Sequence, residues 1–171
     1  MALIKTVRGK TPVYGEGCFF AENATLIGDI MLGDNCSVWF NTVVRGDVNS
    51  IHVGNSTNIQ DGAVIHGTYK LAKTVIGNSV SIGHNALIHG CTIKDHVLIG
   101  MGAIVMDNAI IGPYSLIAAG SVVLAETVIP ARSVYAGIPA RKVKDIDDRL
   151  IEVIKRTALN YPEYASWYHQ E

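Results

Sequence analysis

The sequence predicts a mainly β protein, a parallel β-helix followed by one α-helix, on two observations. First, an aliphatic residue recurs at every sixth position over long stretches, which fits neither a helix, with about 3.6 residues per turn, nor a plain strand. Second, glycine often follows this residue, and a small or β-branched residue often stands two positions before it. Each hexad therefore combines a short strand with a corner, and such units repeat in a parallel β-helix.

The composition agrees with this class. Hydrophobic residues make up 49% of the 171 residues and aromatic residues only 7%, so the apolar residues are mostly aliphatic. The 17 glycines argue against a helix bundle. A formal net charge of −1 gives no reason to expect nucleic acid or an anionic membrane as a partner.

The termini and cysteines bear on location. The first ten residues carry charges and no apolar signal region, and the apolar stretch 98–129 is interrupted by Asp107, Asn108 and Pro113, so no membrane span is expected. Three cysteines form no metal-binding spacing and fit reduced thiols. We expect a cytoplasmic protein with a single domain over residues 1–171.

The recurring aliphatic residues, which we call anchors, define the coils. Three hexads close one triangular coil of about 18 residues, so anchors one coil apart stack in the core. This gives about six coils between residues 12 and 130. The anchors are Phe20, Leu26, Leu32, Val38, Val44, Val53, Ile59, Ile65, Ile76, Ile82, Ile88, Ile93, Ile99, Val105, Ile111, Ile117, Val123 and Ile129.

Three irregularities in the period fall at one corner of the coils. Each follows the third hexad of a coil, and inserted residues at a shared corner can build a site. The spacing gains three residues between Val44 and Val53, gains five between Ile65 and Ile76, and loses one between Ile88 and Ile93.

The pattern stops near Pro130. Residues 131–143 contain the segment "YAGIPAR" and are expected to lead out of the coils. In the C-terminal segment, 144–171, an apolar face predicts a helix over roughly 145–159, which Asn160 and Pro162 should end. We expect this segment to pack along the coils or cap them.

Two histidines occupy equivalent corners. His66 directly follows anchor Ile65 and His89 directly follows anchor Ile88, one coil later. Coils are spaced like strands in a sheet, so the two imidazoles should lie about 5 Å apart. Two imidazoles at that separation can share one metal ion.

His84 belongs to another side of the triangle, because it lies two residues past a second-hexad anchor, Ile82. Five residues of extended chain place His84 about 16 Å from His89 along the contour. Zinc–nitrogen bonds are about 2.0–2.1 Å long, so one chain is not expected to bring His66, His84 and His89 to one ion. A neighbouring subunit could supply His84 around a threefold axis. The alternative, that these are ordinary surface histidines, is open at this point.

Arg45 stacks in line with His66 and His89, and Asp47 stands beside it in the tripeptide "RGD". A salt bridge at a subunit interface explains this pair as well as a catalytic role does, and both can hold. Upstream of His66, the segment "NIQDG" places Asn58, Gln60 and Asp61 near the same region, with Asp61 stacked on His84. A corner residue that bonds backbone is the simpler explanation for Gln60.

The segments "VVRGDVNSIHVGNSTNIQDGAVIHG" and "IGHNALIHGCTI" closely resemble the gamma-class carbonic anhydrase family. The resemblance covers nearly the whole chain, including the "YAGIPAR" exit. It implies a left-handed β-helix and a homotrimer with metal between subunits. In the family pattern His66 and His89 would come from one subunit and His84 from its neighbour, binding Zn2+, with Fe2+ or Co2+ as alternatives.

The same resemblance implies roles for the other residues. Arg45 would pair with Asp47 across the interface, and Gln60 would hydrogen-bond metal-bound solvent. Asn58 and Asp61 would support the site, and Tyr161 would reach towards it. The implied activity is a zinc-dependent lyase reaction, the reversible hydration of CO2 to bicarbonate by a metal-bound hydroxide.

The sequence also departs from the family's best-known active members. Those carry an acidic loop with a glutamate proton shuttle, whereas the loop here is "GTYKLAKT", and Val48 stands where they have a second glutamate. The chain resembles a shorter, loop-poor subgroup, so slow turnover is expected. The alternatives are a hexapeptide-repeat acyltransferase, a CoA-thioesterase, and a metal-stabilised scaffold trimer of weak activity.

Overall fold

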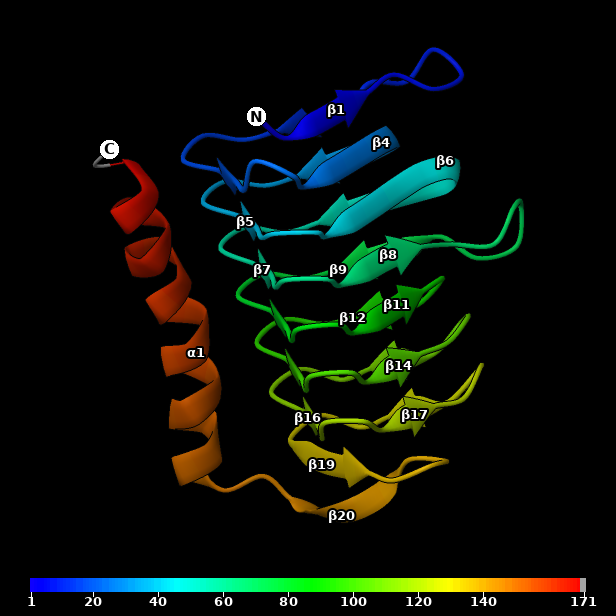
Figure 1. The fold of residues 1–171 in the computed structure, drawn as a ribbon. Coiled ribbons are helices and arrows are strands. Elements are labelled where there is room, and N and C mark those ends of the chain that lie inside the picture. The colour runs from blue at the N-terminus through cyan, green and yellow to red at the C-terminus, as the bar shows by residue number, and fades with distance from the viewer. Residues whose placement is uncertain (170–171) are drawn as a thin grey trace.

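The hexads become short parallel strands that stack into a three-sided prism, a left-handed parallel β-helix with a single long helix beside it (Figure 1). The computed structural model describes residues 1–169. One side, the histidine face, carries the two stacked histidines. Its strands are β1 (Leu3–Lys5), the first part of β4 (Thr25–Leu32) and of β6 (Val43–Val53), β8 (Val64–His66), β11 (Leu87–His89), β14 (Ile104–Val105) and β17 (Val122–Val123).

The two other sides continue the same winding. The far face consists of β2 (Val13–Tyr14), the second parts of β4 and β6, β9 (Thr74–Ile76), β12 (Thr92–Ile93), β15 (Ile110–Ile111) and β18 (Val128–Ile129). The helix face consists of β3 (Phe19–Phe20), β5 (Ser37–Val38), β7 (Asn58–Ile59), β10 (Ser81–Ile82), β13 (Leu98–Ile99), β16 (Leu116–Ile117), β19 (Ser133–Ala136) and the antiparallel β20 (Arg141–Asp145).

The strand register confirms the expected coil length. Leu98 pairs with Leu116, and Ile104 pairs with Val122, eighteen residues apart in both cases. The prism has about seven turns, where the anchors suggested about six. The difference lies at the ends: β1 already pairs with β4, and β19 continues the helix face past Pro130, so the coils extend beyond the expected limits of 12 and 130.

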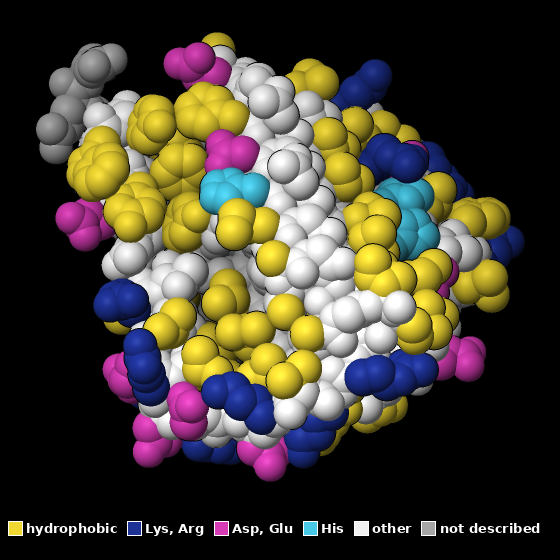
Figure 2. Space-filling view, turned by 60° about the horizontal axis from the view of Figure 1, so that its bottom comes forward, with side chains coloured by type: hydrophobic (Ala, Val, Ile, Leu, Met, Phe, Trp, Pro, Cys, Tyr) yellow, Lys and Arg dark blue, Asp and Glu magenta, His cyan; other side chains and the backbone are white. Residues whose placement is uncertain are grey.

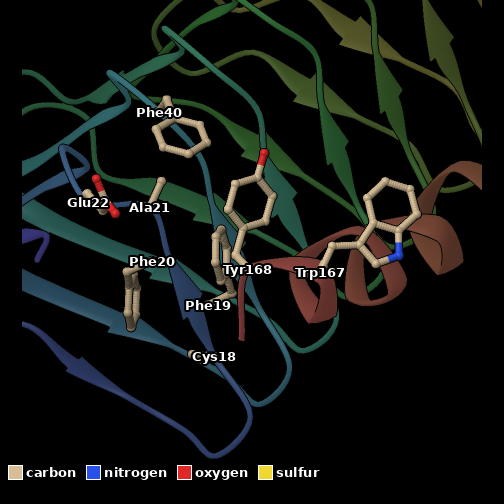
Figure 3. A pocket seen from close by; sticks show the side chains of 8 residues that line it. All are labelled: Cys18, Phe19, Phe20, Ala21, Glu22, Phe40, Trp167 and Tyr168. Carbon is tan, nitrogen blue, oxygen red and sulfur yellow. The ribbon is translucent and has the colours of Figure 1, made fainter. Parts of the chain in front are cut away.

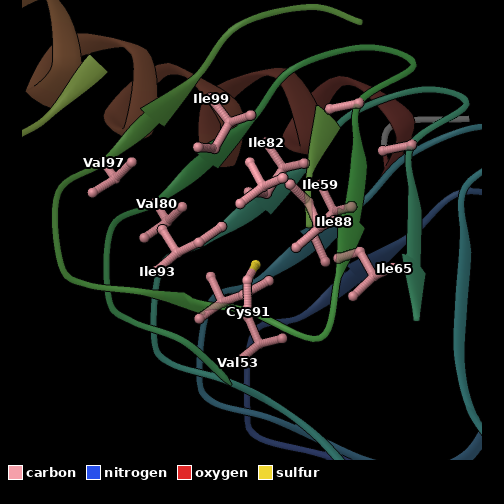
Figure 4. Packing of buried hydrophobic residues seen from close by; sticks show 14 of the residues in the cluster. Val53, Ile59, Ile65, Val80, Ile82, Ile88, Cys91, Ile93, Val97 and Ile99 are labelled. Atoms are coloured by element: carbon pink, nitrogen blue, oxygen red, sulfur yellow. The ribbon is translucent and has the colours of Figure 1, made fainter. Parts of the chain in front are cut away.

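The anchors point inward and stack in columns along the prism axis (Figure 4). Ile59, Ile82 and Ile99 follow one another in such a column, and all three are fully buried. Burying one such side chain is worth about 1.5–3 kcal/mol, so the repeated column supplies much of the stability of the prism. This core fixes the register of every corner, including the corners that carry the histidines.

The three irregularities of the period lie at one corner, between the histidine face and the far face. The register between β4 and β6 shifts between Gly28 and Ile30, where β6 holds extra residues. One turn later a loop follows His66, with Thr68 and Ala72 bridged across it. The backbone passes closely there: a Cβ atom on Gly28, whose φ is +81°, would lie 2.5 Å from the carbonyl oxygen of Gly46.

The C-terminal helix, α1 (Asp148–Ser166), differs from the expected 145–159. It begins later because Asp147 caps it, accepting a hydrogen bond from the Leu150 amide at 2.8 Å. The expectation that Asn160 and Pro162 end it was wrong, since the helix continues for four residues beyond Pro162 and passes into a short 3-10 segment, η1 (Trp167–His169). Pro162 costs the helix one backbone hydrogen bond, but the last turns of α1 pack on the prism, and this packing favours continuation of the helix.

Two apolar clusters hold α1 against the helix face. The helix runs back along the prism towards the end of the prism at which the chain begins (Figure 1). The first cluster contains Val134, Ile146, Ile151 and Ile154. The second contains Phe19, Ala21, Trp39 and Ala165. In the described part of the chain no helix is both long and apolar enough to cross a bilayer.

Candidate functional site

His66 and His89 stack at equivalent strand ends. They are the last residues of β8 and β11, and the parallel register pairs them directly. Their ring centroids are 5.2 Å apart, with the ring planes inclined by 62°. Nδ1 of His66 lies 3.2 Å from Nε2 of His89. The sequence prediction of two imidazoles one turn apart therefore describes their positions well.

Each of these two rings turns its other nitrogen towards a carboxylate. Nε2 of His66 lies 3.1 Å from Oδ1 of Asp47, and Nδ1 of His89 lies 2.6 Å from Oδ1 of Asp107. Arg45 donates to the second oxygen of Asp47 at 2.6 Å. The resemblance implied that this pair forms across an interface, but in this structure of one copy it forms within the chain. Residues two apart in β6 project from the same side of the strand, which brings them together.

The carboxylates determine where the imidazole protons lie. Burial alone would raise the pKa of Asp47, but hydrogen bonds from Arg45 and His66 outweigh it and lower that pKa. Burial is likewise outweighed at Asp107, whose pKa is lowered by hydrogen bonds from Thr68 and His89. Both carboxylates are therefore ionised at neutral pH, and each accepts an N–H from its histidine.

With each far nitrogen donating to its carboxylate, the two facing nitrogens are the acceptor nitrogens of their rings, and at 3.2 Å two such lone pairs repel unless a cation lies between them. Burial lowers the pKa of His66, with smaller opposing contributions from Asp47, so an added proton is disfavoured there. Two nitrogens bound to one tetrahedral zinc ion at about 2.0–2.1 Å are about 3.3 Å apart. The pair thus matches the donor type and the spacing of half a zinc site.

Asp107 was not identified from the sequence as part of this site. It lies two residues past Val105, which pairs with Ile88, so it stands one position beyond the register equivalent of His89 and the anchor count alone does not place it beside that ring. Its second oxygen accepts a hydrogen bond from the Thr68 hydroxyl at 2.5 Å. Thr68 belongs to the loop that follows His66, so this loop supports the histidine pair through Asp107.

His84 lies on a different edge of the prism, in the turn that follows β10. Its Nδ1 is 2.8 Å from Oδ2 of Asp61, and both side chains are partly exposed. The Asn85 amide donates to the Asp61 carbonyl at 2.9 Å, which stacks the two turns as the sequence predicted. With Asp61 holding the Nδ1 proton, Nε2 of His84 is a lone pair available to a ligand.

The remaining sequence-predicted residues gather around His84. Gln60 donates to Asn58 at 3.0 Å, and Asn58 donates to Ser81 at 2.8 Å, so a buried polar chain fixes the Gln60 side chain. Gln60, His84 and Tyr161 line one pocket of about 390 Å³ under α1.

Tyr161 packs edge-on against Trp39, with ring centroids 5.4 Å apart. Burial, with a smaller contribution from the negative charge of Asp61, raises the pKa of Tyr161 to about 12. Tyr161 is therefore a neutral phenol at physiological pH and can donate one hydrogen bond into the pocket.

The structure thus brings the predicted residues together in two groups. The paired half-site contains Arg45, Asp47, His66, His89 and Asp107, and the lone half-site contains Asn58, Gln60, Asp61, His84 and Tyr161. No hydrogen bond, ion pair or ring contact joins His84 to His66 or His89 in residues 1–169.

One copy of the chain does not complete a metal cage. Within the described residues no three His, Cys, Asp or Glu side chains are grouped to hold one metal ion. Figure 2 shows histidine side chains at two separate places on one side of the molecule, with hydrophobic and uncharged side chains between them. Two further histidines have ordinary surroundings: His52 is exposed, and His96 stacks on Tyr114 with centroids 4.7 Å apart.

Comparison with known proteins agrees with the repeat and with the motifs. The family model described as bacterial transferase hexapeptide (six repeats) matches residues 90–125. "Gamma carbonic anhydrase 1, mitochondrial" from Arabidopsis thaliana is 38% identical over 98% of this chain, which spans 63% of that relative's length. "Carbonic anhydrase" from Geobacillus kaustophilus is 36% identical over 97% of this chain and 91% of its own length.

A solved structure shares the complete fold. The crystal structure of a hexapeptide transferase family protein from Anaplasma phagocytophilum is 37% identical, covers 97% of this chain and 98% of its own, and superposes with a TM-score of 0.93. The fold, the hexad repeat and the full-length similarity to proteins named carbonic anhydrase agree with one another. The chain therefore belongs to the gamma-class carbonic anhydrase family of hexapeptide-repeat proteins.

Proposed function

We propose that this protein catalyses the reversible hydration of CO2 to bicarbonate, as a metal-dependent lyase. The metal, Zn2+ in our proposal, is held by His66 and His89 of one copy and His84 of a neighbouring copy in a homotrimer. The single observation that carries the proposal is the pair of facing imidazole nitrogens 3.2 Å apart, with a carboxylate at the other nitrogen of each ring. The names of the relatives support the reaction type.

The surface between the two half-sites supports assembly of copies. Val64, Leu87, Ile104 and Val122 point outward from consecutive strands of the histidine face, and the side chain of Val64 is 37% exposed. This column of aliphatic side chains carries no charge, and such a surface is one that a second copy can cover. A neighbour on this face can bring its lone half-site against the paired half-site.

The residues of the chain divide the work of such a site. A zinc ion held by three imidazoles acts as a Lewis acid that lowers the pKa of a water ligand to about 7. Asp47, Asp61 and Asp107 each hold one histidine proton and so fix which nitrogen faces the centre. Gln60, held by Asn58, and the neutral hydroxyl of Tyr161 can orient a small polar substrate beside His84.

Proton export is expected to be slow. The loop after His66 contains Lys70 and Lys73 and no acid, and both Arg8 and Lys70 lie over its Tyr69 ring, at 5.7 Å and 5.1 Å from the ring centroid. A positively charged loop does not accept a proton readily from a neighbouring site. Turnover that increases with the concentration of an imidazole buffer is the expected sign of a missing shuttle.

The test combines metal analysis with stopped-flow CO2 hydration. The wild-type protein, loaded with zinc or anaerobically with ferrous iron, should hold about one ion per chain and hydrate CO2. His84→Ala and His89→Ala should each lose the ion and the activity. His52→Ala is the matched control, since His52 is exposed and lies outside both half-sites.

Mixed oligomers test whether the site is shared. Co-expression of differently tagged His84→Ala and His89→Ala chains should restore metal and activity at one of the three interfaces of each mixed trimer. Metal binding by an isolated monomer, or no recovery in purified mixed oligomers, would contradict the shared site. Full metal occupancy without CO2 hydration in any buffer would contradict the reaction and leave the scaffold alternative.

Acyl transfer from a CoA thioester is the second candidate. The apolar residues that line the pocket beside His84 include Leu98, Met101 and Leu116, and the pocket could take an extended apolar chain. His84 could then act as a general base. Acyl-CoA turnover by metal-free protein would favour this reaction, whereas its absence together with metal-dependent CO2 hydration would exclude it.

A further inference from the structure

Two cysteines lie one turn apart in a single column of the prism. Cys18 and Cys36 are separated by eighteen residues, the coil length, and the residues that follow them, Phe19 and Ser37, are paired in register. The Phe19 amide donates to the Cys36 carbonyl at 2.8 Å. Neighbouring parallel strands are about 4.8 Å apart, which falls within the Cα separation of about 4.4–6.8 Å that a disulfide can bridge.

Each of the two thiols also has a structural role, as a small hydrogen-bond donor to the next turn. Cys18 donates its S–H to the Gly33 carbonyl at 3.2 Å, and Cys36 donates to the Gly54 carbonyl at 3.0 Å. Thr57, one turn later in the same column, donates to the Gly77 carbonyl at 2.9 Å. A hydroxyl therefore satisfies this contact, and serine at either cysteine position should preserve the fold while removing the thiol chemistry.

The two thiols have different access to solvent. Cys18 is half-buried and lies at the edge of a pocket of about 510 Å³, beside Phe19 and Phe20 and on the opposite side from Trp167 (Figure 3). Cys36 lies one turn later in the same column, and only 1% of it is exposed. A small polar oxidant can thus reach Cys18 first, with Cys36 as the adjacent second sulfur.

The surroundings also favour a reactive Cys18. The Cys36 thiol, by hydrogen bonding, lowers the pKa of Cys18 to about 7, although burial opposes this shift. The third cysteine provides an internal comparison, because burial raises the pKa of Cys91 to about 12. The thiolate is the reacting form, so Cys91 should be inert under conditions in which Cys18 reacts.

We propose that Cys18 and Cys36 form an oxidisable dithiol, a site of modification by hydrogen peroxide that is separate from the histidine half-sites. The Cys18 thiolate attacks one peroxide oxygen, the O–O bond breaks and hydroxide leaves, giving a sulfenic acid at Cys18. The Cys36 sulfur then attacks the Cys18 sulfur, the S–O bond breaks and water leaves with the Cys36 proton. One peroxide is reduced to two waters as the dithiol is oxidised to a disulfide.

The disulfide would link the first turn of the helix face to the second. That end of the prism has an unpaired strand edge at β3 and also supports the last turns of α1 through Phe19. Closing an eighteen-residue loop restricts the unfolded chain, so the oxidised protein should melt several degrees higher than the reduced protein. A dithiol reductant should reverse the shift.

The experiment treats reduced protein with equimolar hydrogen peroxide and maps peptides by mass spectrometry without reduction. We expect one cross-linked pair containing Cys18 and Cys36, with Cys91 still free and alkylated only after unfolding. In native protein, Cys18 should be alkylated at least about tenfold faster than Cys91. Cys36→Ser should instead give a Cys18 sulfenic acid that dimedone traps, and Cys18→Ser should give neither product.

Circular dichroism on both serine variants controls for folding, since each keeps the hydrogen bond to the next turn. Conversion of wild-type Cys18 to sulfinic acid without a cross-link would overturn the proposal, because Cys36 would then not resolve it. Equal oxidation of Cys91 and Cys18 would overturn it as well, because the reactivity would not be specific to the column.

Discussion

Nδ1 of His66 lies 3.2 Å from Nε2 of His89, and an ionised carboxylate holds the far nitrogen of each ring. This arrangement fixes both tautomers with lone pairs facing each other. It is stable when a cation occupies the space between the rings. These two carboxylates, together with Asp61 behind His84, therefore prepare the histidines for a ligand that a single copy cannot fully enclose.

Asp107 should control metal affinity through His89. Asp107→Asn keeps the shape but removes the charge that holds the Nδ1 proton, so we expect the affinity for Co2+ or Zn2+ to fall about 10–100-fold. Chelator competition and the visible spectrum of the Co2+ form measure this. Thr68→Val, which removes only the hydrogen bond to Asp107, should have a smaller effect. Equal affinities in Asp107→Asn and wild type would rule out this role.

Ile88 should be among the residues on which stability depends most. It is fully buried in the anchor columns, so Ile88→Ala should lower the free energy of unfolding by about 2–5 kcal/mol. Ile110 is 39% exposed on the far face, and Ile110→Ala should change the free energy of unfolding by no more than about 0.5 kcal/mol. Urea unfolding of the two variants measures the difference, and similar losses would show that the columns are not the main source of stability.

Glycine at corner position 100 should be required for steric reasons. A Cβ atom on Gly100 would lie 2.4 Å from the Ala119 amide nitrogen, and backbone atoms cannot move aside cheaply. Gly100→Ala should therefore destabilise the protein more than Gly102→Ala does. At Gly102 no atom lies within 4 Å of the added Cβ, and the only cost is the φ of +66°, which an alanine adopts at about 1–2 kcal/mol. Thermal melting of both variants gives the order, and the reverse order would refute the packing explanation.

The cap of α1 should make the helix sensitive to acid. The amide of Leu150, together with Lys144, lowers the pKa of Asp147 in the folded protein. A lowered folded-state pKa adds stability above the ordinary carboxyl value of about 3.9, and this stability is lost as the pH falls through the folded value. Tryptophan fluorescence should therefore report loosening of α1 in acid. Asp147→Asn keeps a capping oxygen that does not titrate, so this variant should show a weaker dependence of the fluorescence on pH. An acid transition that is the same in the variant and the wild type would contradict a role for the Asp147 cap.

The sequence by itself determined the repeat and therefore the columns. Counting from the anchors, with the five inserted residues between Ile65 and Ile76 set aside, requires that His66 stack on His89 and that Asp61 stack on His84, because each coil repeats the path of the one before. The positions of the three irregularities in the period also followed from counting. These positions follow from the period of the sequence alone, because folding places residues at equivalent positions of successive coils one above the other.

Only the tertiary structure decided what depends on contacts between distant segments. The helix passes Pro162 because Ala165 and Tyr161 pack on Trp39, a contact that no local propensity contains. The Arg45–Asp47 bond within one chain, and the carboxylate behind each histidine, depend on side-chain directions at particular strand ends.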